Sequence, residues 1–482
     1  MGHGRAAGFL TLVAVSAACT PSEYRRPLPP AVVVIVADDL GWGEVGFHGG
    51  SVPTPNLDRL AAEGVVLERM YAQPICSATR AALLTGRDPI RFGMARAVIT
   101  PWRRFGLPPD EVTLPEALSQ DAYPRRGAFG KWHLGHLERR WHPLSQGFTE
   151  FRGHYNGAVD HFTHEREREL DWHDDFESLR EEGYATRLEA AAAARFIDRY
   201  AGQGPYLCYV GLSAAHAPFQ APPETLARFA HLAEPDGSAG VRQVRAAMLA
   251  EIDAAVGAVL DAIGRSKGAD ETLVWFVGDN GAGPEQPDAN APWRGAKGTL
   301  YEGALRVPAV VRWPRAFSGG RRVSDPTSVV DVFATTLAAC SGWREEPRDL
   351  SERIGRSLDG RDLRLVLRDG SGAPKRELGF YDGQEGPELE RVAIRTPEWK
   401  LIVSGPDLTR GPPGDAHGIE LFAIEDDPEE RSDVAAAHPD VVRELVEKAR
   451  AYRALQPAES VAPYWEGHEG FVPPPEWRVP AD

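Results

Sequence analysis

The stretch of sequence that decides the fold is Ala31-Val32-Val33-Val34-Ile35-Val36-Ala37-Asp38-Asp39. Its apolar part is too short for a typical helix and too uniformly apolar for a strand that has one face in solvent. Similar apolar runs occupy 206–212, 272–277 and 307–313. We therefore predict that all four runs are buried strands of a sheet that is covered on both faces.

Helix-competent segments alternate with these strands. The longest, 241–263, repeats apolar residues three and four positions apart, which is the spacing of one buried helix face. Such alternation predicts an α/β fold with a large doubly wound, mostly parallel sheet core. The other predicted helices span 56–63, 80–84, 114–119 and 184–200.

The pattern changes after the turn-forming segment 371–374. Short strand-like pieces separated by turn signals follow it, and then a helix at 439–455. We predict a core domain over 31–370 and a smaller C-terminal α+β subdomain over 371–482, an antiparallel sheet plus a helix with a proline-rich tail. The strand-like pieces lie at 378–381, 391–395, 399–403 and 420–423.

Composition sets limits on function. The 482 residues carry 54 Lys plus Arg against 70 Asp plus Glu, a net charge of −16. With 42% hydrophobic residues the chain can bury a core, which argues against disorder. An acidic chain is a poor polyanion binder, so we predict no nucleic-acid partner. Only six of the cations are Lys, against 48 Arg, so a Lys inside a motif calls for a chemical reason.

The N-terminus predicts export. Arg5 and an apolar run at 9–18 are typical of a secretory signal peptide over 1–18, and the Cys19 that follows is typical of a bacterial lipoprotein signal. We predict a lipid anchor at Cys19, a short tether over 19–30, and a periplasmic or cell-surface location in a bacterium. Simple secretion is the alternative.

Polar side chains follow two of the predicted strands. Asp38 and Asp39 come directly after the first apolar run, and Asp279 and Asn280 come after the run 272–277. In open α/β sheets, ligands gather at the carboxyl ends of the strands. Three carboxylates and an amide oxygen there predict a site for Ca²⁺ or Mg²⁺ rather than Zn²⁺, and Ca²⁺ suits the higher ligand count. Turn-forming residues without a metal are the alternative.

One cysteine stands in a polar setting. Cys208 and Cys340 lie in apolar segments and are predicted as core residues, without a disulfide framework. Cys76 instead precedes the helix-competent segment 77–84, so it falls at a helix N-terminus, where free N–H groups favour an anion. Arg80 lies four residues on, on the same helix face. Both side chains are therefore predicted to point to one anion site; a buried Cys with a surface Arg is the alternative.

This segment, Cys76-Ser77-Ala78-Thr79-Arg80 followed by Leu84-Thr85-Gly86, resembles the signature of the formylglycine-dependent sulfatases. These enzymes belong to the alkaline phosphatase superfamily, and their signature Cys is oxidised to formylglycine after translation. The resemblance extends over almost the whole mature chain, toward arylsulfatases and N-acetylgalactosamine-6-sulfatases. The further motifs, in the family's order, are Asp38-Asp39, Gly130-Lys131-Trp132-His133-Leu134-Gly135, Ala214-Ala215-His216-Ala217-Pro218, Asp279-Asn280 and Gly295-Ala296-Lys297-Gly298-Thr299-Leu300-Tyr301-Glu302-Gly303.

The residues themselves support this resemblance. Lys131 and His133 are two apart, so on an extended segment both would face the same side. Lys297 stands in a glycine-rich stretch that can approach a ligand closely. Unlike Arg, Lys can give up a proton, which explains why two of six lysines fall in these motifs. The resemblance implies one metal ion on Asp38, Asp39, Cys76, Asp279 and Asn280, and catalytic roles for Cys76, Arg80, Lys131, His133, His216 and Lys297.

The resemblance also implies a mechanism. One hydroxyl of hydrated formylglycine at position 76, polarised by Ca²⁺, attacks sulfur in line with the leaving alkoxide. Arg80 and Lys131 hold the sulfate oxygens, and His216 and Lys297 are candidates to protonate the leaving oxygen. His133 then takes the proton of the second hydroxyl and sulfate departs. A maturase, the enzyme that converts the signature Cys to formylglycine, must oxidise Cys76. The aerobic maturase prefers Pro at the position that Ala78 occupies in this chain.

Two other functions stay open. A phosphoester or phosphonate hydrolase of the same superfamily would share the fold and the metal residues. A lipoprotein that only binds sulfated glycan would bind without turnover. The segment 153–164 resembles one found in sulfatases that act on sulfated amino sugars and aryl sulfates, so we expect a sulfated carbohydrate as substrate. A solvated polar loop is the alternative for that segment.

Overall fold

The computed structural model describes residues 1–2, 29–119, 123–234, 236–237, 239–286, 288–342, 350–370 and 375–480. Residues 3–18 of the predicted signal peptide, Cys19 and most of the tether therefore lie outside the described residues. The same holds for 371–374, where we placed the boundary between the two domains. None of the helices in the described ranges is long and apolar enough to cross a lipid bilayer.

A ten-stranded sheet forms the centre of the molecule, and it confirms the predicted α/β class. Its strand order is β14-β2-β13-β11-β1-β10-β4-β5-β8-β9. The strands from β11 to β5 are parallel, whereas β13, β8 and β9 make antiparallel pairs toward the edges. The bounds are β1 Ala31–Ala37, β2 Val65–Leu67, β4 Arg125–Lys131, β5 Glu150–His154, β8 His173–Asp174, β9 Glu177–Ser178, β10 Tyr206–Gly211, β11 Thr272–Gly278, β13 Ala309–Arg312 and β14 Arg321–Val323.

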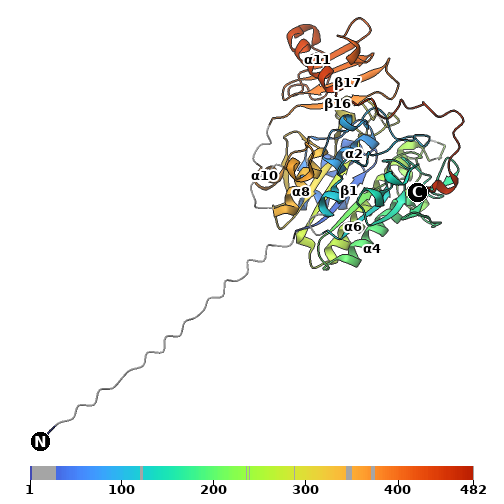
Figure 1. The fold of residues 1–482 in the computed structure, drawn as a ribbon. Helices are drawn as coiled ribbons and strands as arrows, with labels where there is room; N and C mark the ends of the chain where they lie inside the picture. Colours follow the sequence, from blue (N-terminus) through green and yellow to red (C-terminus); the bar gives the residue numbers. More distant parts are fainter. Residues whose placement is uncertain are drawn as a thin grey trace.

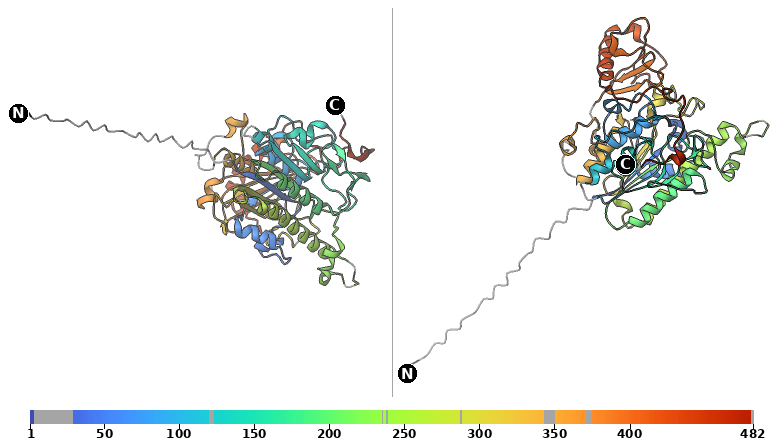
Figure 2. Two further views of the ribbon diagram at one scale, coloured as in Figure 1. Left: turned by 90° about the horizontal axis from the view of Figure 1, so that it is seen from below. Right: turned by 45° about the vertical axis from the view of Figure 1, so that its right-hand side comes forward.

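Helices cover both faces of this sheet, as the uniformly apolar strands predicted (Figures 1 and 2). The even-numbered side chains of β1 enter one hydrophobic core and the odd-numbered ones enter another. The first core is closed by α2, α3 and α8, and the second by α1, α4 and α6. These helices are α1 Pro55–Glu63, α2 Cys76–Thr85, α3 Leu114–Ser119, α4 Ala185–Tyr200, α6 Val241–Arg265 and α8 Val330–Gly342.

One predicted strand is wrong. The apolar run 307–313 divides into β12 (Arg306–Val307) and β13, which belong to different sheets. Pro308 separates them, because proline has no N–H to donate to a ladder. Its carbonyl instead accepts a hydrogen bond from Gly278 (3.0 Å) at the end of β11. β12 joins a small sheet with β3 (Met70–Tyr71) and β15 (Thr327–Ser328).

The C-terminal part contains the predicted antiparallel sheet and helix. The strands β16, β17, β18 and β19 pair in sequence order, and α11 packs on them through its own hydrophobic cluster (Figure 1). Their bounds are β16 Leu378–Asp382, β17 Glu390–Arg395, β18 Lys400–Gly405, β19 Gly418–Phe422 and α11 Pro439–Arg453. The remaining short elements are β6 Glu165–Arg166, β7 Glu169–Leu170, α5 Pro223–Ala227, α7 Glu302–Leu305, α9 Leu350–Ile354 and α10 Arg364–Asp369.

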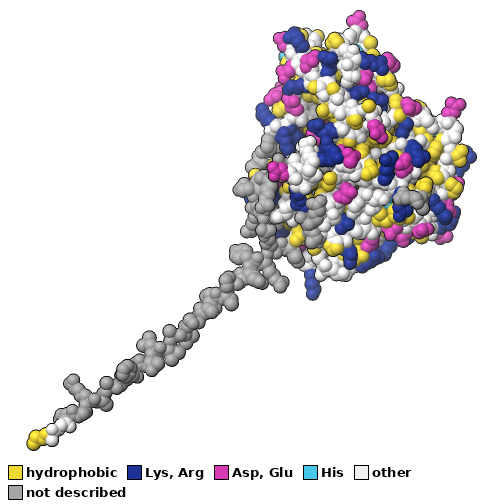
Figure 3. Space-filling model, viewed as in Figure 1, with side chains coloured by type: hydrophobic (Ala, Val, Ile, Leu, Met, Phe, Trp, Pro, Cys, Tyr) yellow, Lys and Arg dark blue, Asp and Glu magenta, His cyan; other side chains and the backbone are white. Residues whose placement is uncertain are grey.

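The surface mixes charges of both signs. On the face shown in Figure 3, Lys and Arg side chains lie interspersed with Asp and Glu and with single hydrophobic side chains. Many surface arginines pair with acids, as Arg391 does with Glu385 (2.8 Å) and Arg410 with Glu388 (2.6 Å). Such exposed pairs contribute little stability each.

A buried charge cluster joins the C-terminal sheet to the core. Lys400 Nζ of β18 lies 3.0 Å from Glu302 Oε1 and 2.8 Å from Glu430 Oε1, and all three side chains are almost fully buried. Glu302 also accepts a hydrogen bond from the hydroxyl of Tyr71 (2.8 Å). Because Glu302 follows the loop that carries Lys297, this cluster ties the C-terminal sheet to a predicted site loop.

Replacing Lys400 by Met should lower the free energy of unfolding by about 3–5 kcal/mol, because two carboxylates would lose their buried counter-charge. The midpoint of urea unfolding measures the change. Lys375→Met is the matched control, since that side chain is 80% exposed in its pair with Glu398; it should cost at most about 1 kcal/mol. Equal midpoints for the two variants would contradict the structural role of the cluster.

Candidate active site

The two motifs predicted to bind a metal ion, Asp38-Asp39 and Asp279-Asn280, lie side by side. β1 and β11 are parallel neighbours whose last residues, Ala37 and Gly278, are in register. Asp38-Asp39 and Asp279-Asn280 therefore leave the same edge of the sheet. The amide of Asp39 donates to Asp279 Oδ1 (3.1 Å), and Asn280 Nδ2 donates to Asp39 Oδ1 (2.7 Å). The structure thus gathers the three carboxylates and the amide that the sequence indicated.

Cys76 begins α2, as predicted, and its side chain faces these acids. Cys76 Sγ and one carboxylate oxygen each of Asp38 and Asp279 lie within 4.8 Å of one another. Arg80, one turn along, donates from Nε (3.1 Å) and Nη2 (2.8 Å) to Asp279 Oδ2, and from Nη1 to the carbonyl of Lys131 (3.1 Å). The alternative of a surface Arg is therefore wrong, since Arg80 is fully buried.

Lys131 and His133 both reach the site, but not for the reason that the sequence offered. β4 ends at Lys131, and His133 has a left-handed backbone (φ 60°), so the pair does not alternate along a strand. Lys131 Nζ lies 2.5 Å from Asp38 Oδ2. His133 Nδ1 lies 3.3 Å from Cys76 Sγ. The turn after β4, and not strand periodicity, brings the two side chains together.

The hydrogen bonds of His133 define its tautomer. Its Nε2 lies 3.0 Å from the carbonyl oxygen of Ile99, which can only accept. Nε2 therefore carries the proton, and the lone pair of Nδ1 faces Cys76. Burial, together with the charges of Lys131 and Arg80, lowers the pKa of His133 well below its usual range, so the ring is neutral at neutral pH.

Lys297 and His216 complete the cluster from the other side. Lys297 Nζ lies 2.7 Å from Asp39 Oδ1, and its loop is held by hydrogen bonds from Lys297 N to the carbonyl of Ala282 and from Gly298 N to that of Pro74, both 3.0 Å. His216 Nε2 lies 3.8 Å from Asp39 Oδ2. Every predicted site residue thus lies in one cluster.

Burial and charge shift the pKa values of these groups. Burial acts to raise the pKa of Asp39, but the charges of Lys297 and His216 outweigh it and lower it below its usual range. Burial and the charge of Asp38 raise the pKa of Asp279 to about 6. Burial and the charge of Lys297 lower the pKa of His216 to about 3. Besides burial, the raised pKa of Asp279 reflects repulsion by the neighbouring carboxylate of Asp38, which a bound cation would relieve.

The residues fit a metal ion. Within the described ranges, Asp38 Oδ1 and Asn280 Oδ1 are buried and have no hydrogen-bond partner. Buried polar oxygens rarely stay unpaired. Two such oxygens beside the carboxylates of Asp39 and Asp279 offer the all-oxygen ligand set that Ca²⁺ and Mg²⁺ prefer.

Sequence reasoning missed Arg245. Its Nη2 donates to the carbonyl of Asp39 (2.5 Å), its Nη1 donates to that of Ala215 (2.9 Å), and Glu44 pairs with it. Arg245 therefore holds the loop of Asp38 and Asp39 and the loop of His216 together. A signal was available, because position 245 falls on the apolar face of the predicted helix 241–263, where an arginine has no place without a partner.

The segment 153–164 is not the solvated polar loop that was the alternative. His154, His161 and His164 are each buried. The ring of His161 lies 3.2 Å, through Nε2, from the carbonyl oxygen of His216, so the segment lies against the histidine loop of the site. Phe162, with 40% of its surface exposed, and Thr163 are the exposed residues of the segment.

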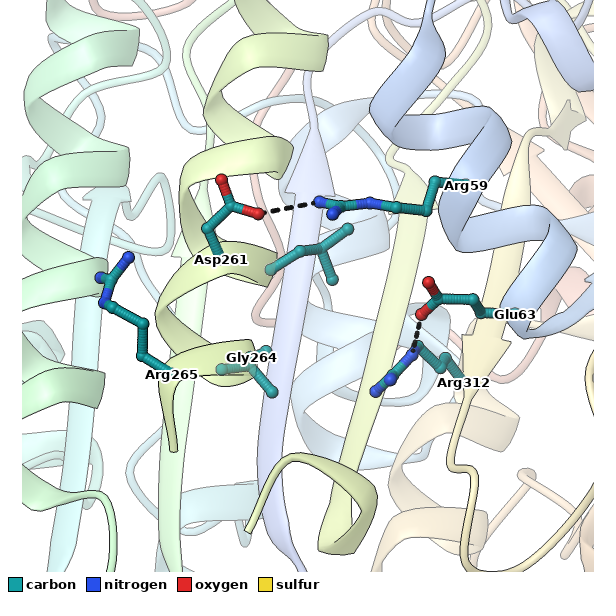
Figure 4. Close-up of a pocket in the computed structure, with 8 residues that line it drawn as sticks. Arg59, Glu63, Asp261, Gly264, Arg265 and Arg312 are labelled. Atoms are coloured by element: carbon teal, nitrogen blue, oxygen red, sulfur yellow. Dashed lines mark hydrogen bonds and ion pairs between the residues drawn. The ribbon is translucent and has the colours of Figure 1, made fainter. Parts of the chain in front are cut away.

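A second cavity, of about 480 Å³, is a different place (Figure 4). Arg59 and Asp261 pair across it at 3.1 Å, and Arg312 pairs with Glu63 at 2.7 Å. Asp261 lies sixteen residues beyond Arg245 on α6, about 24 Å along the helix from the active-site end. The third arginine of the lining, Arg265, pairs with Asp198 (2.8 Å). Each charged side chain of this cavity thus has an ion-pair partner, and the cavity does not hold the residues of the chemistry above.

Carboxylates at the ends of parallel strands, Cys76 at a helix N-terminus and neighbouring cations are groups that a hydrolase acting on an anionic ester needs. The chain belongs to the sulfatase family, whose model matches residues 30–342. It is therefore an enzyme that hydrolyses sulfate esters. The family resemblance that the sequence motifs carried is confirmed.

Individual relatives agree. Human N-acetylgalactosamine-6-sulfatase is 32% identical over 431 residues, which cover 83% of this chain and 78% of the relative. Human arylsulfatase A is 34% identical over 402 residues, covering 77% and 74%. Among solved structures, Ps i-CgsB in complex with k-i-k-neocarrahexaose is similar with a TM-score of 0.76 and 27% identity, over 89% of this chain and 94% of that one.

Proposed function

We propose that this sulfatase releases sulfate from a sulfated carbohydrate, with formylglycine made from Cys76 as its nucleophilic residue and one bound Ca²⁺. The observation that carries the proposal is the placement of Cys76. Its Sγ lies near carboxylate oxygens of Asp38 and Asp279 and 3.3 Å from the Nδ1 lone pair of His133.

The thiol itself is a poor nucleophile here. Burial raises the pKa of Cys76, so at neutral pH the thiol keeps its proton, and thiol nucleophiles react as thiolates. Formylglycine supplies hydroxyl groups in the same position when it is formed and hydrated. This supports a role for residue 76 after oxidation by a maturase, whose identity Ala78 leaves open.

His133 is placed to accept a proton at position 76. Its Nε2–H is held by the carbonyl of Ile99 (3.0 Å), which orients the Nδ1 lone pair toward residue 76. A neutral imidazole within hydrogen-bond reach of the reacting group meets the geometric requirement for a general base. We propose that it takes up the proton when sulfate leaves.

Three cations line the site: Arg80 and Lys131 are buried, and the side chain of Lys297 is 19% exposed. Arg80, Lys131 and Lys297 each already contact a carboxylate (2.8, 2.5 and 2.7 Å). Added to a divalent ion, they exceed the charge of Asp38, Asp39 and Asp279, which leaves a net positive site for an anionic ester. We propose that Arg80 and Lys131 bind sulfate oxygens.

Lys297 and His216 are the candidates to protonate the leaving oxygen. Burial acts to lower the pKa of Lys297, but the charge of Asp39 outweighs it and raises the pKa above its ordinary value, so Lys297 carries a proton. His216 donates through Nδ1 to the carbonyl of Ala217 (2.6 Å) and is neutral. Lys297 is therefore the better placed donor, with His216 beside it.

The metal ion would be held by Asp38, Asp39, residue 76, Asp279 and Asn280. When bound, it supplies Lewis-acid polarisation of the sulfate and of the nucleophile. Lys131 contacts Asp38 and Lys297 contacts Asp39, two of these proposed ligands. Both ammonium groups would therefore lie beside an ester bound at the metal ion. Ca²⁺ is proposed because it accepts many oxygen ligands.

A carbohydrate substrate is supported by the relatives' names. One is an N-acetylgalactosamine-6-sulfatase, and one solved structure holds k-i-k-neocarrahexaose. The segment 153–164, which packs on the loop of His216, offers buried histidines beside the site. Export as a Cys19-anchored bacterial lipoprotein, proposed from residues outside the described ranges, would suit an external glycan.

We also propose that the core domain ends at residue 370 and that the C-terminal subdomain begins at residue 371.

A substrate panel tests this function. The purified holoenzyme should release sulfate from sulfated mono- or oligosaccharides with kcat/KM at least about tenfold above that for an aryl sulfate, since sugar contacts add binding. Aryl phosphate and phenylphosphonate esters should be poor substrates. Activity on the aryl sulfate alone would remove the support for a sugar. Faster phosphate or phosphonate hydrolysis would favour the other superfamily activity, and binding without turnover would favour a glycan-binding lipoprotein.

A further inference from the structure

Trp465 is unusually exposed for a tryptophan. It presents 69% of its surface to solvent, more than any other aromatic side chain in the part of the chain that the structure describes. The next is Phe162 at 40%. An exposed large aromatic side chain is unfavourable in a free protein, and exposed apolar surface often marks a binding site.

The Trp465 ring is nevertheless held in one orientation. Trp102 lies parallel to it, with the ring centroids 5.9 Å apart and an angle of 11° between the planes. Tyr464 (4.8 Å, 78°) and His468 (5.5 Å, 88°) pack at right angles to it. We call these four side chains the aromatic platform. Aromatic pairs of this geometry attract one another, so the platform is preorganised.

Three of the platform side chains lie on the tail that returns from the C-terminal sheet to the core (Figure 1), and the fourth, Trp102, belongs to the core. The amide of Val461 donates to the carbonyl of Gly93 (2.8 Å) at one end. At the other end Trp477 is fully buried, and its Nε1 donates to the carbonyl of Arg166 (2.9 Å). Between these two anchors, Trp102 Nε1 donates to the carbonyl of Tyr464 (3.1 Å).

Two connections place the platform beside the active site. The carbonyl that accepts from His133 belongs to Ile99, three residues before Trp102, and three residues span at most about 11 Å. The amide of Tyr464 donates to the carbonyl of Gln384 (2.8 Å). The Gln384 side chain lies 3.8 Å from where a Cβ on Gly298 would be, next to Lys297.

We propose that the aromatic platform binds an unsulfated sugar ring of an oligosaccharide substrate, through stacking on the exposed face of Trp465. The apolar C–H face of a pyranose matches a flat aromatic ring. None of the four platform side chains is a Lys or Arg that would hold a sulfate group, and the neighbouring Arg103 is buried and donates to the carbonyl of Pro463 (2.7 Å). Exposed Glu466 and Glu469 flank it and can accept hydrogen bonds from sugar hydroxyls. This inference rests on the proposed function, since it assigns the part of the substrate beyond the sulfated ring.

Trp465→Ala tests the platform. With a sulfated hexasaccharide the variant should show a roughly tenfold higher KM and little change in kcat, because one stacking contact is lost. With the corresponding sulfated monosaccharide KM should stay within about twofold, because that substrate does not reach the platform. Trp465→Tyr, which keeps a flat ring, should restore most of the hexasaccharide KM.

Val472→Ala is the matched control, an exposed apolar side chain (80%) on the same tail; both its KM values should match wild type. Unchanged hexasaccharide KM in Trp465→Ala, or an equal rise for both substrates, would overturn the proposal. So would a wild-type dimer that becomes monomeric in Trp465→Ala with KM unchanged, because the platform would then be a subunit contact.

Calorimetry separates this inference from the proposed function. The Kd of the hexasaccharide measures the contribution of the platform to binding and does not require turnover. If the wild-type enzyme hydrolyses no sulfated sugar, the proposed carbohydrate function fails. The platform fails only if the hexasaccharide Kd is the same for wild type and Trp465→Ala, and a roughly tenfold weaker Kd supports it whatever the turnover.

Discussion

Replacing Cys76 by Ala should reduce kcat by roughly 10⁴- to 10⁶-fold, because the residue that we propose to attack sulfur is removed while the cations remain. Arg80, Lys131 and Lys297 keep their carboxylate partners in the variant, so sulfated substrate should still bind. Sulfate release measured by ion chromatography gives the rate, and calorimetry gives the affinity.

Cys208→Ala is the control for loss of a buried thiol. Cys208 lies in the middle of β10 and is fully buried, so its removal can cost stability but should leave kcat of the folded enzyme within about twofold. Peptide mass analysis of the native enzyme should show residue 76 as an aldehyde. An unmodified Cys76 throughout fully active protein would contradict the proposed mechanism, as would an active Cys76→Ala variant.

Removal of the metal should have an effect of similar size. Chelator-treated enzyme is expected to lose activity and to regain it with Ca²⁺, and elemental analysis should find one ion per chain. Asp38→Asn should lower kcat/KM by roughly 10³-fold, because one ligand charge is lost and Lys131 loses its 2.5 Å partner.

Asp261→Asn makes the same chemical change in the remote cavity, where the Asp261 side chain is 60% exposed, and should be nearly neutral. Two ions per chain would favour a two-metal phosphatase. Full activity without any bound ion would exclude the proposed role of Asp38, Asp39, Asp279 and Asn280.

Much of the fold was predictable because short-range patterns specify it. The uniform hydrophobicity of 31–37 predicted a strand buried on both faces, and β1 indeed sends alternate side chains into two cores. The wrong strand prediction at 307–313 has a local cause. Hydrophobicity alone predicts one continuous strand there, but Pro308 interrupts it. Cys76 at the start of α2 followed from residues only a few positions away.

The candidate site was predictable in its members but not in its contacts. Its motifs lie at 38–39, 76–80, 131–133, 216, 279–280 and 297, and their residue types indicated anion and metal chemistry. The left-handed turn at His133 and the clamp by Arg245 depend on loops and helices distant in sequence. An arginine on an apolar helix face indicates that position 245 needs a partner, but the sequence does not show which partner the fold brings close.

The sequence by itself determined the fold class, the acidic composition and the set of chemical groups, since hydrophobic period and residue type act over a few neighbouring positions. Only the tertiary structure decided which groups touch: the proton on His133 Nε2, the unpaired oxygens of Asp38 and Asn280, and the tail that sets Trp465 beside the site. The physical reason is that hydrogen bonds, desolvation and charge coupling act through space over a few ångströms, and chain separation does not reveal those distances.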